Sequence, residues 1–316
     1  MTIIKLITHF LDYTDVEKGL SKKTQENYAR CLERFRRWLV DSNMQNLLPH
    51  ELTSEIVWQY RLFLSRKAIS KKTKAELSKK TQNMYLIALR GLLSYFSVRD
   101  IPSLSPDKIR LAKQEKNHSV HFLSLEKVKR LLDSPAGNDL TSKRDKAILE
   151  SLFSTGFRVS ELVQLDRDHI SVKNTNKVVE YSVTGKGNKT RTVYFSLRAL
   201  SAIQAYLGAR EDIDQAMFIN YSPTAPDVGS RRLTARSIER IVKKYVKLAG
   251  LPLNTTPHTL RHSFATDLLN QGVDIRMVQE FLGHEDISTT QIYTHVTNKN
   301  LRDIYTKFHG GKRSEK

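Results

Sequence analysis

The sequence lacks the features that mark secreted, membrane-spanning and metal-clustering proteins. Its single cysteine, Cys31, excludes an internal disulfide and a cysteine metal cluster. No run of about 18 apolar residues could span a bilayer. The start, MTIIKLITHFLDYTDVEKG, carries acids and has no long apolar segment of the kind found in signal peptides. We therefore expect a cytoplasmic protein, with Cys31 on the buried face of a helix.

Acidic residues are few beside the basic ones. Lysine and arginine number 52, aspartate and glutamate 33, and the formal net charge is +19. A soluble protein with a solvated basic surface is one interpretation, and a polyanion partner is the other. Because the excess is so large, it favours a nucleic acid. A membrane surface would also attract this charge, but the sequence has no lipidation or amphipathic anchor to hold it there.

The length of 316 residues suits two domains. Apolar residues at helical spacing predict four helices before Asp100, and three of them start at or near Ser21, Thr53 and Ser78. A polar, basic stretch follows Pro102 and Pro106. We expect domain boundaries as follows: a helical DNA-binding domain over 1–111, a linker over 112–121, a second domain over 122–310 and a disordered tail over 311–316.

The second domain contains one change of period. Residues 178–195 form two β-rich runs around GKGNK, which predicts a hairpin. Helical patterns precede the hairpin and return after it as far as Phe308. The predicted fold class is therefore mainly α with one small antiparallel β-sheet.

A short repeat lies within the first domain. Residues 20–28 read LSKKTQENY and residues 77–85 read LSKKTQNMY. Both could be good helix starts and nothing more, but lysines at a helix N-terminus oppose the helix dipole. The same unfavourable placement in two helices suggests a bound phosphate, held by backbone N–H groups, hydroxyls and lysines. The predicted DNA contacts are Lys22, Lys23, Thr24, Lys79, Lys80 and Thr81.

Four motifs in the second domain carry groups suited to phosphoryl chemistry. Two arginines offer forked donors that match the non-bridging oxygens of a phosphodiester. A tyrosine, with a pKa of about 10, is a nucleophile that must lose its proton during attack, and a histidine can accept it. A lysine can protonate the leaving oxygen. These groups are Arg158 and Glu161 in TGFRVSEL, Lys186 in TGKGNKTR, His258 and Arg261 in PHTLRHSFAT, and His284 and Tyr293 in LGHEDISTTQIYTH.

Outside the motif of Arg261, each of these residues taken singly favours an ordinary structural interpretation, and their joint order and spacing favours chemistry. Two rivals for a role remain open, Lys189 for the lysine and Tyr305, within an apolar stripe, for the tyrosine. The ordinary interpretations are a surface salt bridge for Arg158 with Glu161, a turn lysine for Lys186, a helix cap for His258, a core histidine for His262 and a half-buried aromatic for Tyr293.

In this order and spacing the chain resembles the tyrosine site-specific recombinases of the phage-integrase family, most of all the Xer-type members. The resemblance implies a two-domain, C-shaped DNA clamp, made of an N-terminal SAM-like core-binding domain and a catalytic domain. The acids form no two-metal carboxylate cluster and the histidines are not at zinc spacing with carboxylates, so we expect no metal or other cofactor. The implied roles are nucleophile for Tyr293, phosphate clamp for Arg158 and Arg261, general acid for Lys186, base for His258, hydrogen-bonding stabiliser for His284 and orientation of Arg158 for Glu161.

The resemblance also implies how DNA is read and which partners are needed. The segment RRLTARSIERIVKKYVKLAGL resembles the family helix that enters the major groove. We expect double-stranded DNA with inverted-repeat half-sites, a homo-tetramer that works through a four-way junction, and possibly a paralogous recombinase as partner. The candidate groove contacts are Arg231, Arg232, Arg236 and Arg240.

Three functions stay open on the sequence alone. The first is recombination, either in Xer-like dimer resolution during chromosome segregation or in minimal mobile-element integration and excision. The second is strand relaxation by an enzyme resembling type IB topoisomerases or resolvases. The third is a catalytically silent architectural DNA-binding protein. The six filled site positions favour the first.

Overall fold

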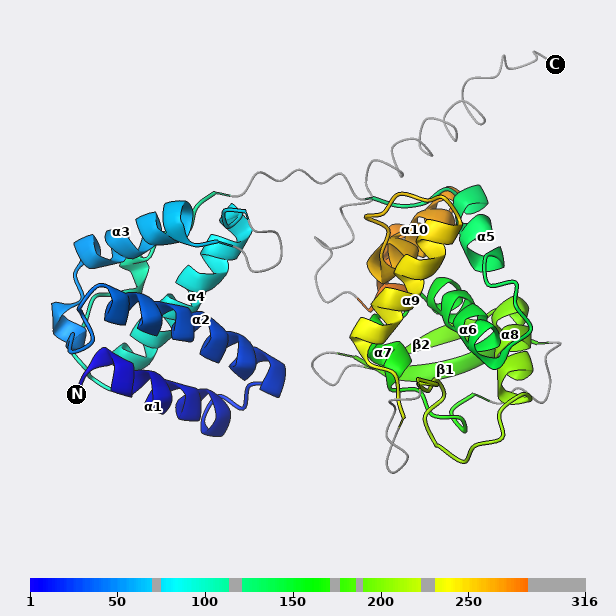
Figure 1. Cartoon of the computed structure of the whole chain (residues 1–316), viewed down its shortest axis with the longest axis horizontal. Helices are drawn as coiled ribbons and strands as arrows, with labels where there is room; N and C mark the ends of the chain where they lie inside the picture. The colour runs from blue at the N-terminus through cyan, green and yellow to red at the C-terminus, as the bar shows by residue number, and fades with distance from the viewer. Residues whose placement is uncertain (70–74, 114–120, 171–176, 186–189, 223–230, 284–316) are drawn as a thin grey trace, which may run out of the picture. The chain divides into compact units, whose positions relative to one another are not determined.

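The structure is a computed structural model that describes residues 1–69, 75–113, 121–170, 177–185, 190–222 and 231–283. Lys186, Lys189, His284, Tyr293, Tyr305 and the predicted tail at 311–316 lie outside the described residues. The chain divides into two compact units, Met1–Asn117 and His118–Lys316. The described part is mostly helical, with one two-stranded antiparallel sheet (Figure 1), as the sequence predicted.

The first unit is a helical bundle. Ser21, Thr53 and Ser78 are the N-caps of three of its helices, and each side chain accepts a hydrogen bond from the backbone three residues on, which confirms the predicted starts. Its elements are α1 (Ile3–Val16), α2 (Lys22–Asp41), the 3₁₀ turn η1 (Pro49–Glu51), α3 (Ser54–Leu62), the π turn η2 (Phe63–Lys67), α4 (Lys79–Val98) and the 3₁₀ turn η3 (Pro106–Lys108).

The core of this unit is aliphatic and aromatic. Cys31 is buried on the apolar face of α2, as expected. Phe35 packs edge-on against Tyr60 of α3 at a centroid distance of 4.9 Å, and Trp38 lies 5.1 Å from the same ring. Full burial of a large apolar side chain contributes about 1.5–3 kcal/mol, so this cluster holds α2 and α3 together.

The second unit surrounds the long central helix α6, which packs against α8, α10 and the sheet. The core between these elements includes Leu149, Leu152, Phe195 and Ile203. The helices and strands of this unit are α5 (Leu125–Asp133), α6 (Leu140–Thr155), α7 (Val159–Val163), β1 (Val179–Thr184), β2 (Thr190–Phe195), α8 (Leu197–Leu207), α9 (Ala235–Leu248), α10 (Pro257–Asn270) and α11 (Ile275–Leu282).

The predicted hairpin is confirmed. β1 and β2 pair antiparallel from Val179 opposite Phe195 to Thr184 opposite Thr190. On β2 the side chains alternate, so that Val193 and Phe195 are buried while their neighbours are exposed. One face of the sheet therefore packs on the core.

The expectation of helix throughout the stretch after the hairpin is wrong between α8 and α9. Residues 208–222 and 231–234 are irregular and form two isolated bridges, Asp166 with Ala216 and Ile219 with Arg232. The buried Arg210 organises this segment, since its guanidinium pairs with Asp212 and donates to backbone carbonyls at 216 and 217. The arginine thus supplies hydrogen-bond donors to backbone carbonyls outside any helix, and this arrangement has no periodic signal in the sequence.

Within the described ranges, no helix combines the length and apolarity needed to cross a membrane.

Candidate active site

A glycine turn brings Arg158 to the end of α6. Gly156 is the C-cap of that helix with a left-handed φ of 61°, and a Cβ there would lie 2.7 Å from Cδ1 of Phe264 on α10. Only glycine fits this conformation and this contact. Two residues later Arg158 becomes the N-cap of α7. The turn therefore sets Arg158 beside α10.

Arg158 is held by three hydrogen bonds. Its backbone N–H donates to Oε2 of Glu161 at 2.8 Å, and Nη1 donates to Oε1 at 2.9 Å. Its Nη2 donates to the carbonyl oxygen of Gly283 at 3.0 Å. The side chain is 31% exposed, so part of the guanidinium faces solvent. Glu161 thus contacts Arg158, as predicted, through the start of α7 and not through a shared helix face.

Arg261, on α10, is almost fully buried, and its guanidinium reaches the same end of α11 as that of Arg158. Its Nη1 donates to the carbonyl of Gly156 at 2.6 Å, and another nitrogen donates to the carbonyl of Leu282. These carbonyls end α6 and α11, where the helix dipoles are negative. The guanidinium joins the two helix ends and places its charge near that of Arg158.

A third arginine, which is not among the site residues predicted from the sequence, completes the group. Arg191 of β2 donates from Nη1 and Nη2 to the two oxygens of Glu161, at 2.8 and 2.7 Å, and from Nε to the carbonyl of Phe281 at 3.0 Å. The available signal was its position two and four residues before buried Val193 and Phe195. An arginine on the inward face of a strand needs a carboxylate partner.

Glu161 is the shared acid of this group. Burial raises the pKa of its carboxyl, but the ion pair with Arg191 and the hydrogen bonds from Arg158 outweigh burial and lower the pKa to about 2. The carboxylate is therefore charged at all physiological pH values and keeps both arginines in place.

Two histidines lie on α10. Thr256, not His258, is the N-cap of this helix, so the interpretation of His258 as a cap is wrong. Partial burial, followed by the charges of Arg261 and Arg158, lowers the pKa of His258. Burial is also the largest cause that lowers the pKa of His262, to about 4. A neutral His258 imidazole beside two guanidinium groups is able to accept a proton.

Two of the predicted residues outside the described ranges directly follow described glycines. Lys186 directly follows Gly185, at the end of β1, and His284 directly follows Gly283, at the end of α11. A hollow of about 490 Å³ lies between α7 and β1 and is lined by Arg158, Gln164, Tyr181 and Gly185 among others. The described ends of both segments thus border the arginine group.

One group of side chains has the geometry of a metal site. Ligand atoms of Asp166, Asp168 and His169 lie within 4.8 Å of one another. Asp166 already pairs with Arg232, and Nδ1 of His169 accepts a hydrogen bond from the Asp166 backbone. We assign no metal to this cluster, because Asp166 and His169 already have protein partners and exposed acids often gather without an ion.

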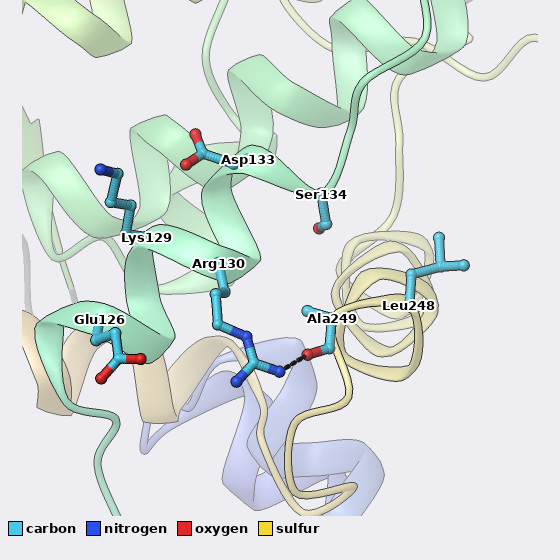
Figure 2. A pocket seen from close by; sticks show the side chains of 7 residues that line it. All are labelled: Glu126, Lys129, Arg130, Asp133, Ser134, Leu248 and Ala249. Atoms are coloured by element: carbon cyan, nitrogen blue, oxygen red, sulfur yellow. Dashed lines mark hydrogen bonds between the residues drawn. The ribbon is translucent and has the colours of Figure 1, made fainter.

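A second hollow, of about 540 Å³, lies between α5 and the end of α9 (Figure 2). Arg130 donates to the carbonyl of Ala249 there, and Lys129 and Asp133 add charge to the wall. None of the predicted site residues lines it.

The lysine repeat has the same local structure in both helices. Ser21 and Ser78 lie 3.0 Å from the hydroxyls of Thr24 and Thr81, respectively. The side-chain amides of the glutamines that follow donate to the carbonyls of Leu20 and Leu77. Lys22, Lys23, Lys79 and Lys80 are exposed beside these caps, and Lys23 also pairs with Glu26 at 2.8 Å.

The four candidate groove arginines fall into two kinds. Arg236 and Arg240 are exposed on α9. Arg231 and Arg232 precede that helix, because it begins only at Ala235. Arg232 donates from Nη1 to the carbonyls at 163 and 165, at 2.8 and 2.9 Å, and pairs with Asp166. Arg232 is therefore part of the protein scaffold.

Comparisons with known families and proteins agree along nearly the whole chain. Residues 121–300 match the phage integrase family, and residues 7–100 match the phage integrase N-terminal SAM-like domain. The tyrosine recombinase XerC of Thermodesulfovibrio yellowstonii is 34% identical over 305 residues, covering 96% of this chain and 95% of the relative. The tyrosine recombinase XerD of Lacticaseibacillus casei is 35% identical over 312 residues, covering 96% and 98%.

Solved structures share the fold. XerH recombinase bound to palindromic difH substrate, in a post-cleavage complex, superposes with a TM-score of 0.69 at 24% identity, covering 92% of this chain and 81% of that one. A lambda integrase (75–356) dimer bound to a COC′ core site gives a TM-score of 0.68 at 14% identity, covering 94% and 95%. At these identities the likeness shows the fold alone.

Proposed function

This chain belongs to the phage integrase family, and from that premise we propose how its own residues cut and rejoin DNA. It is a Xer-type tyrosine recombinase, and its reaction is site-specific DNA recombination. The observation that carries the proposal is the meeting of Arg158 and Arg261 at the end of α11. This end directly precedes His284, and Tyr293 follows His284 by nine residues (293 − 284 = 9).

In the proposed cleavage step, the phenol oxygen of Tyr293 attacks the scissile phosphorus. The bond from phosphorus to the 5′-oxygen breaks, which leaves a 3′-phosphotyrosyl link. The phenol proton passes to neutral His258, and Lys186 gives a proton to the departing 5′-oxygen, which becomes a hydroxyl. Arg158, Arg261 and His284 stabilise the charge on the non-bridging oxygens.

Rejoining reverses these steps with a different 5′-hydroxyl. The phosphotyrosine keeps the energy of the phosphodiester, so religation needs no nucleotide. Two successive exchanges pass through a four-way junction. The arginines supply the charge that a metal ion supplies in other phosphoryl-transfer enzymes, and we therefore assign no cofactor.

The partner is DNA. We propose that the site consists of inverted-repeat half-sites, that four copies act together, and that a paralogous recombinase takes part where the two half-sites differ. The proposed location is the cytoplasm, and the proposed role is dimer resolution during chromosome segregation. Integration or excision of a minimal mobile element uses the same chemistry and differs in the DNA sites used.

The DNA contacts are proposed from exposure and charge. The caps of α2 and α4 each offer backbone N–H groups and two exposed lysines to a phosphate, with Thr24 and Thr81 in the caps. Arg231, Arg236 and Arg240 are the proposed contacts near the start of α9, and we leave Arg232 out because its side chain binds the scaffold.

Tyr293→Phe tests the proposal directly. A nicked suicide substrate carrying the cognate site traps the covalent intermediate, because the cut end diffuses away. The wild-type protein should form a covalent protein–DNA adduct, whereas Tyr293→Phe should bind the site equally well and form none. Tyr305→Phe is the matched control and should form the adduct. An adduct with Tyr293→Phe would disprove the assignment of the nucleophile.

A further inference from the structure

Arg191 joins three elements of the second unit. It lies on β2, only 7% of its side chain is exposed, and its three kinds of nitrogen all donate hydrogen bonds. Two go to the carboxylate of Glu161 and one goes to the carbonyl of Phe281. One side chain thus ties the hairpin to α7 and to the last turn of α11.

The stem of Arg191 also packs against that turn. Gly283 ends α11 with a left-handed φ of 60°, and a Cβ at this position would lie 2.7 Å from Cδ of Arg191. Real Cβ atoms do not approach a carbon so closely. The turn that ends α11 therefore fits around the arginine, and glycine meets both the conformation and the contact.

The contacts form a closed ring around the end of α11. Arg158 binds Glu161 and the carbonyl of Gly283, and Arg191 binds Glu161 and the carbonyl of Phe281. Glu161 is the acid that the two arginines of this ring share. A lysine at 191 cannot reproduce it, because an ammonium group lacks the planar fork that binds both carboxylate oxygens at once.

We propose that Arg191 is a positioning residue for DNA cleavage: it fixes the last turn of α11 relative to Arg158, and so fixes where the chain continues into His284. The inference rests on the proposed roles of Arg158, His284 and Tyr293. Arg191 acts through these residues and not on the DNA. A misplacement of about 1 Å at a reacting centre can slow chemistry about 100-fold.

An arginine that only supports the fold would behave differently, and Arg144 is the matched control. It lies on α6, pairs with Asp145, and donates to the carbonyl of Ile219 at 2.9 Å. Side-chain exposures are 7% and 1% in this pair, against 7% and 5% for Arg191 and Glu161. The two arginines are thus equally buried and similarly bonded, but the hydrogen bonds of Arg144 hold α6 to the irregular segment before α9 and not to the end of α11.

The experiment compares Arg191→Lys with Arg144→Lys. Thermal unfolding, affinity for the cognate site and single-turnover cleavage of a nicked substrate are measured at a temperature where both variants are folded. Both should lose similar stability and bind DNA within about three-fold of wild type. Arg191→Lys should cleave about 100-fold more slowly, whereas Arg144→Lys should cleave within about three-fold of wild type. Equal cleavage rates for the two variants would overturn the proposal.

Arg191 lies on the strand that follows Lys186, so its replacement could slow cleavage through Lys186 instead of through α11. A second substrate distinguishes these two causes. A 5′-bridging phosphorothioate has a leaving group that needs no proton, so it relieves a defect in the general acid. We expect Arg191→Lys to cleave the phosphorothioate substrate more slowly than the wild type does. Recovery to the wild-type rate would show that Arg191 serves Lys186, against the proposal.

Gly283→Ala decides the question if Arg191→Lys does not fold. The alanine keeps every charged group but pushes a Cβ against Cδ of Arg191, and it should also slow cleavage. Gly272→Ala is its control, with a φ of 87° and nothing within 4 Å of the added Cβ. Equal cleavage by these two would overturn the proposal. A wild-type protein that forms no adduct at all would instead refute the proposed function.

Discussion

Arg158 and Arg261 donate hydrogen bonds to the carbonyls of consecutive residues, Gly283 and Leu282, at the end of α11. The two guanidinium groups come from α7 and α10 and meet at the negative end of a third helix. In the proposed function, this arrangement holds both cations in place before the phosphate arrives. A preorganised charge needs no rearrangement during a reaction, which makes it effective in catalysis.

Replacing either clamp arginine by lysine should abolish most cleavage. Arg158→Lys and Arg261→Lys keep the charge but lose the bidentate geometry, and we expect cleavage about 10²–10³-fold slower. Single-turnover trapping of the adduct on a nicked site measures the rate. Arg130→Lys is the control, because Arg130 also binds a helix C-terminal carbonyl, in a hollow that none of the predicted site residues lines. Near wild-type cleavage by either clamp variant would contradict the assigned role.

The lowered pKa of His258 predicts an unusual acid limit for cleavage. Burial and the neighbouring Arg261 and Arg158 lower this pKa, so the imidazole is mostly neutral at its ordinary pKa of 6.5. As pH falls, the rate at sub-saturating DNA should therefore reach half of its plateau only below pH 6.5. A pH–rate profile measures this decline on its acid limb, and His258→Gln should lack that limb. A limb that titrates at or above 6.5 and disappears in His258→Gln would refute the argument.

Glu161 should give the fold a stability that depends on pH. Its pKa is about 2 in the folded protein, against an ordinary 4.5, so its ion pairs stabilise fully above pH 4.5 and progressively less as pH falls towards 2. A shift of this size corresponds to about 3 kcal/mol. Urea unfolding should show Glu161→Gln less stable than wild type by about 2–3 kcal/mol at pH 7, with the gap shrinking by pH 3. A gap that is constant over this range would contradict it.

The paired lysines at the start of α4 should contribute to the salt dependence of DNA binding. Lys79→Gln with Lys80→Gln should lower the slope of log affinity against log salt by up to about 0.9 for each phosphate that the variant no longer neutralises. Lys22→Gln with Lys23→Gln should do the same at α2. The control with equal charge change is Arg36→Gln with Arg37→Gln, since both arginines pair with Glu33. Equal slopes in control and test variants would show that the repeat only starts helices.

Two of the groove arginines should behave in opposite ways. Arg232→Gln removes bonds to two carbonyls and to Asp166, so it should destabilise the protein by about 1–3 kcal/mol and leave base preference unchanged. Arg240→Gln, on the exposed face of α9, should change stability by less than about 0.5 kcal/mol and weaken binding. Selection from a randomised half-site library and urea unfolding separate the two. Full stability of Arg232→Gln would refute its scaffold role.

Local signals explain what the sequence could predict. Ser21, Thr53 and Ser78 were recognisable as helix starts because an N-cap depends on the side chain and the next few backbone N–H groups. The hairpin was recognisable because alternation and a glycine turn are also local. The irregular residues between α8 and α9 were mispredicted because Arg210 satisfies their backbone through contacts that leave no periodic signal in the sequence.

The sequence by itself determined the family, the basic charge, and the order and types of the groups that carry the chemistry, because all of these are properties of the chain read in one dimension. Only the tertiary structure decided that Arg158 and Arg261 share one helix end, that Arg232 serves the scaffold, and that Arg191 joins Glu161 to α11. These contacts link residues far apart in the chain, and no local propensity encodes which buried charge will find which partner.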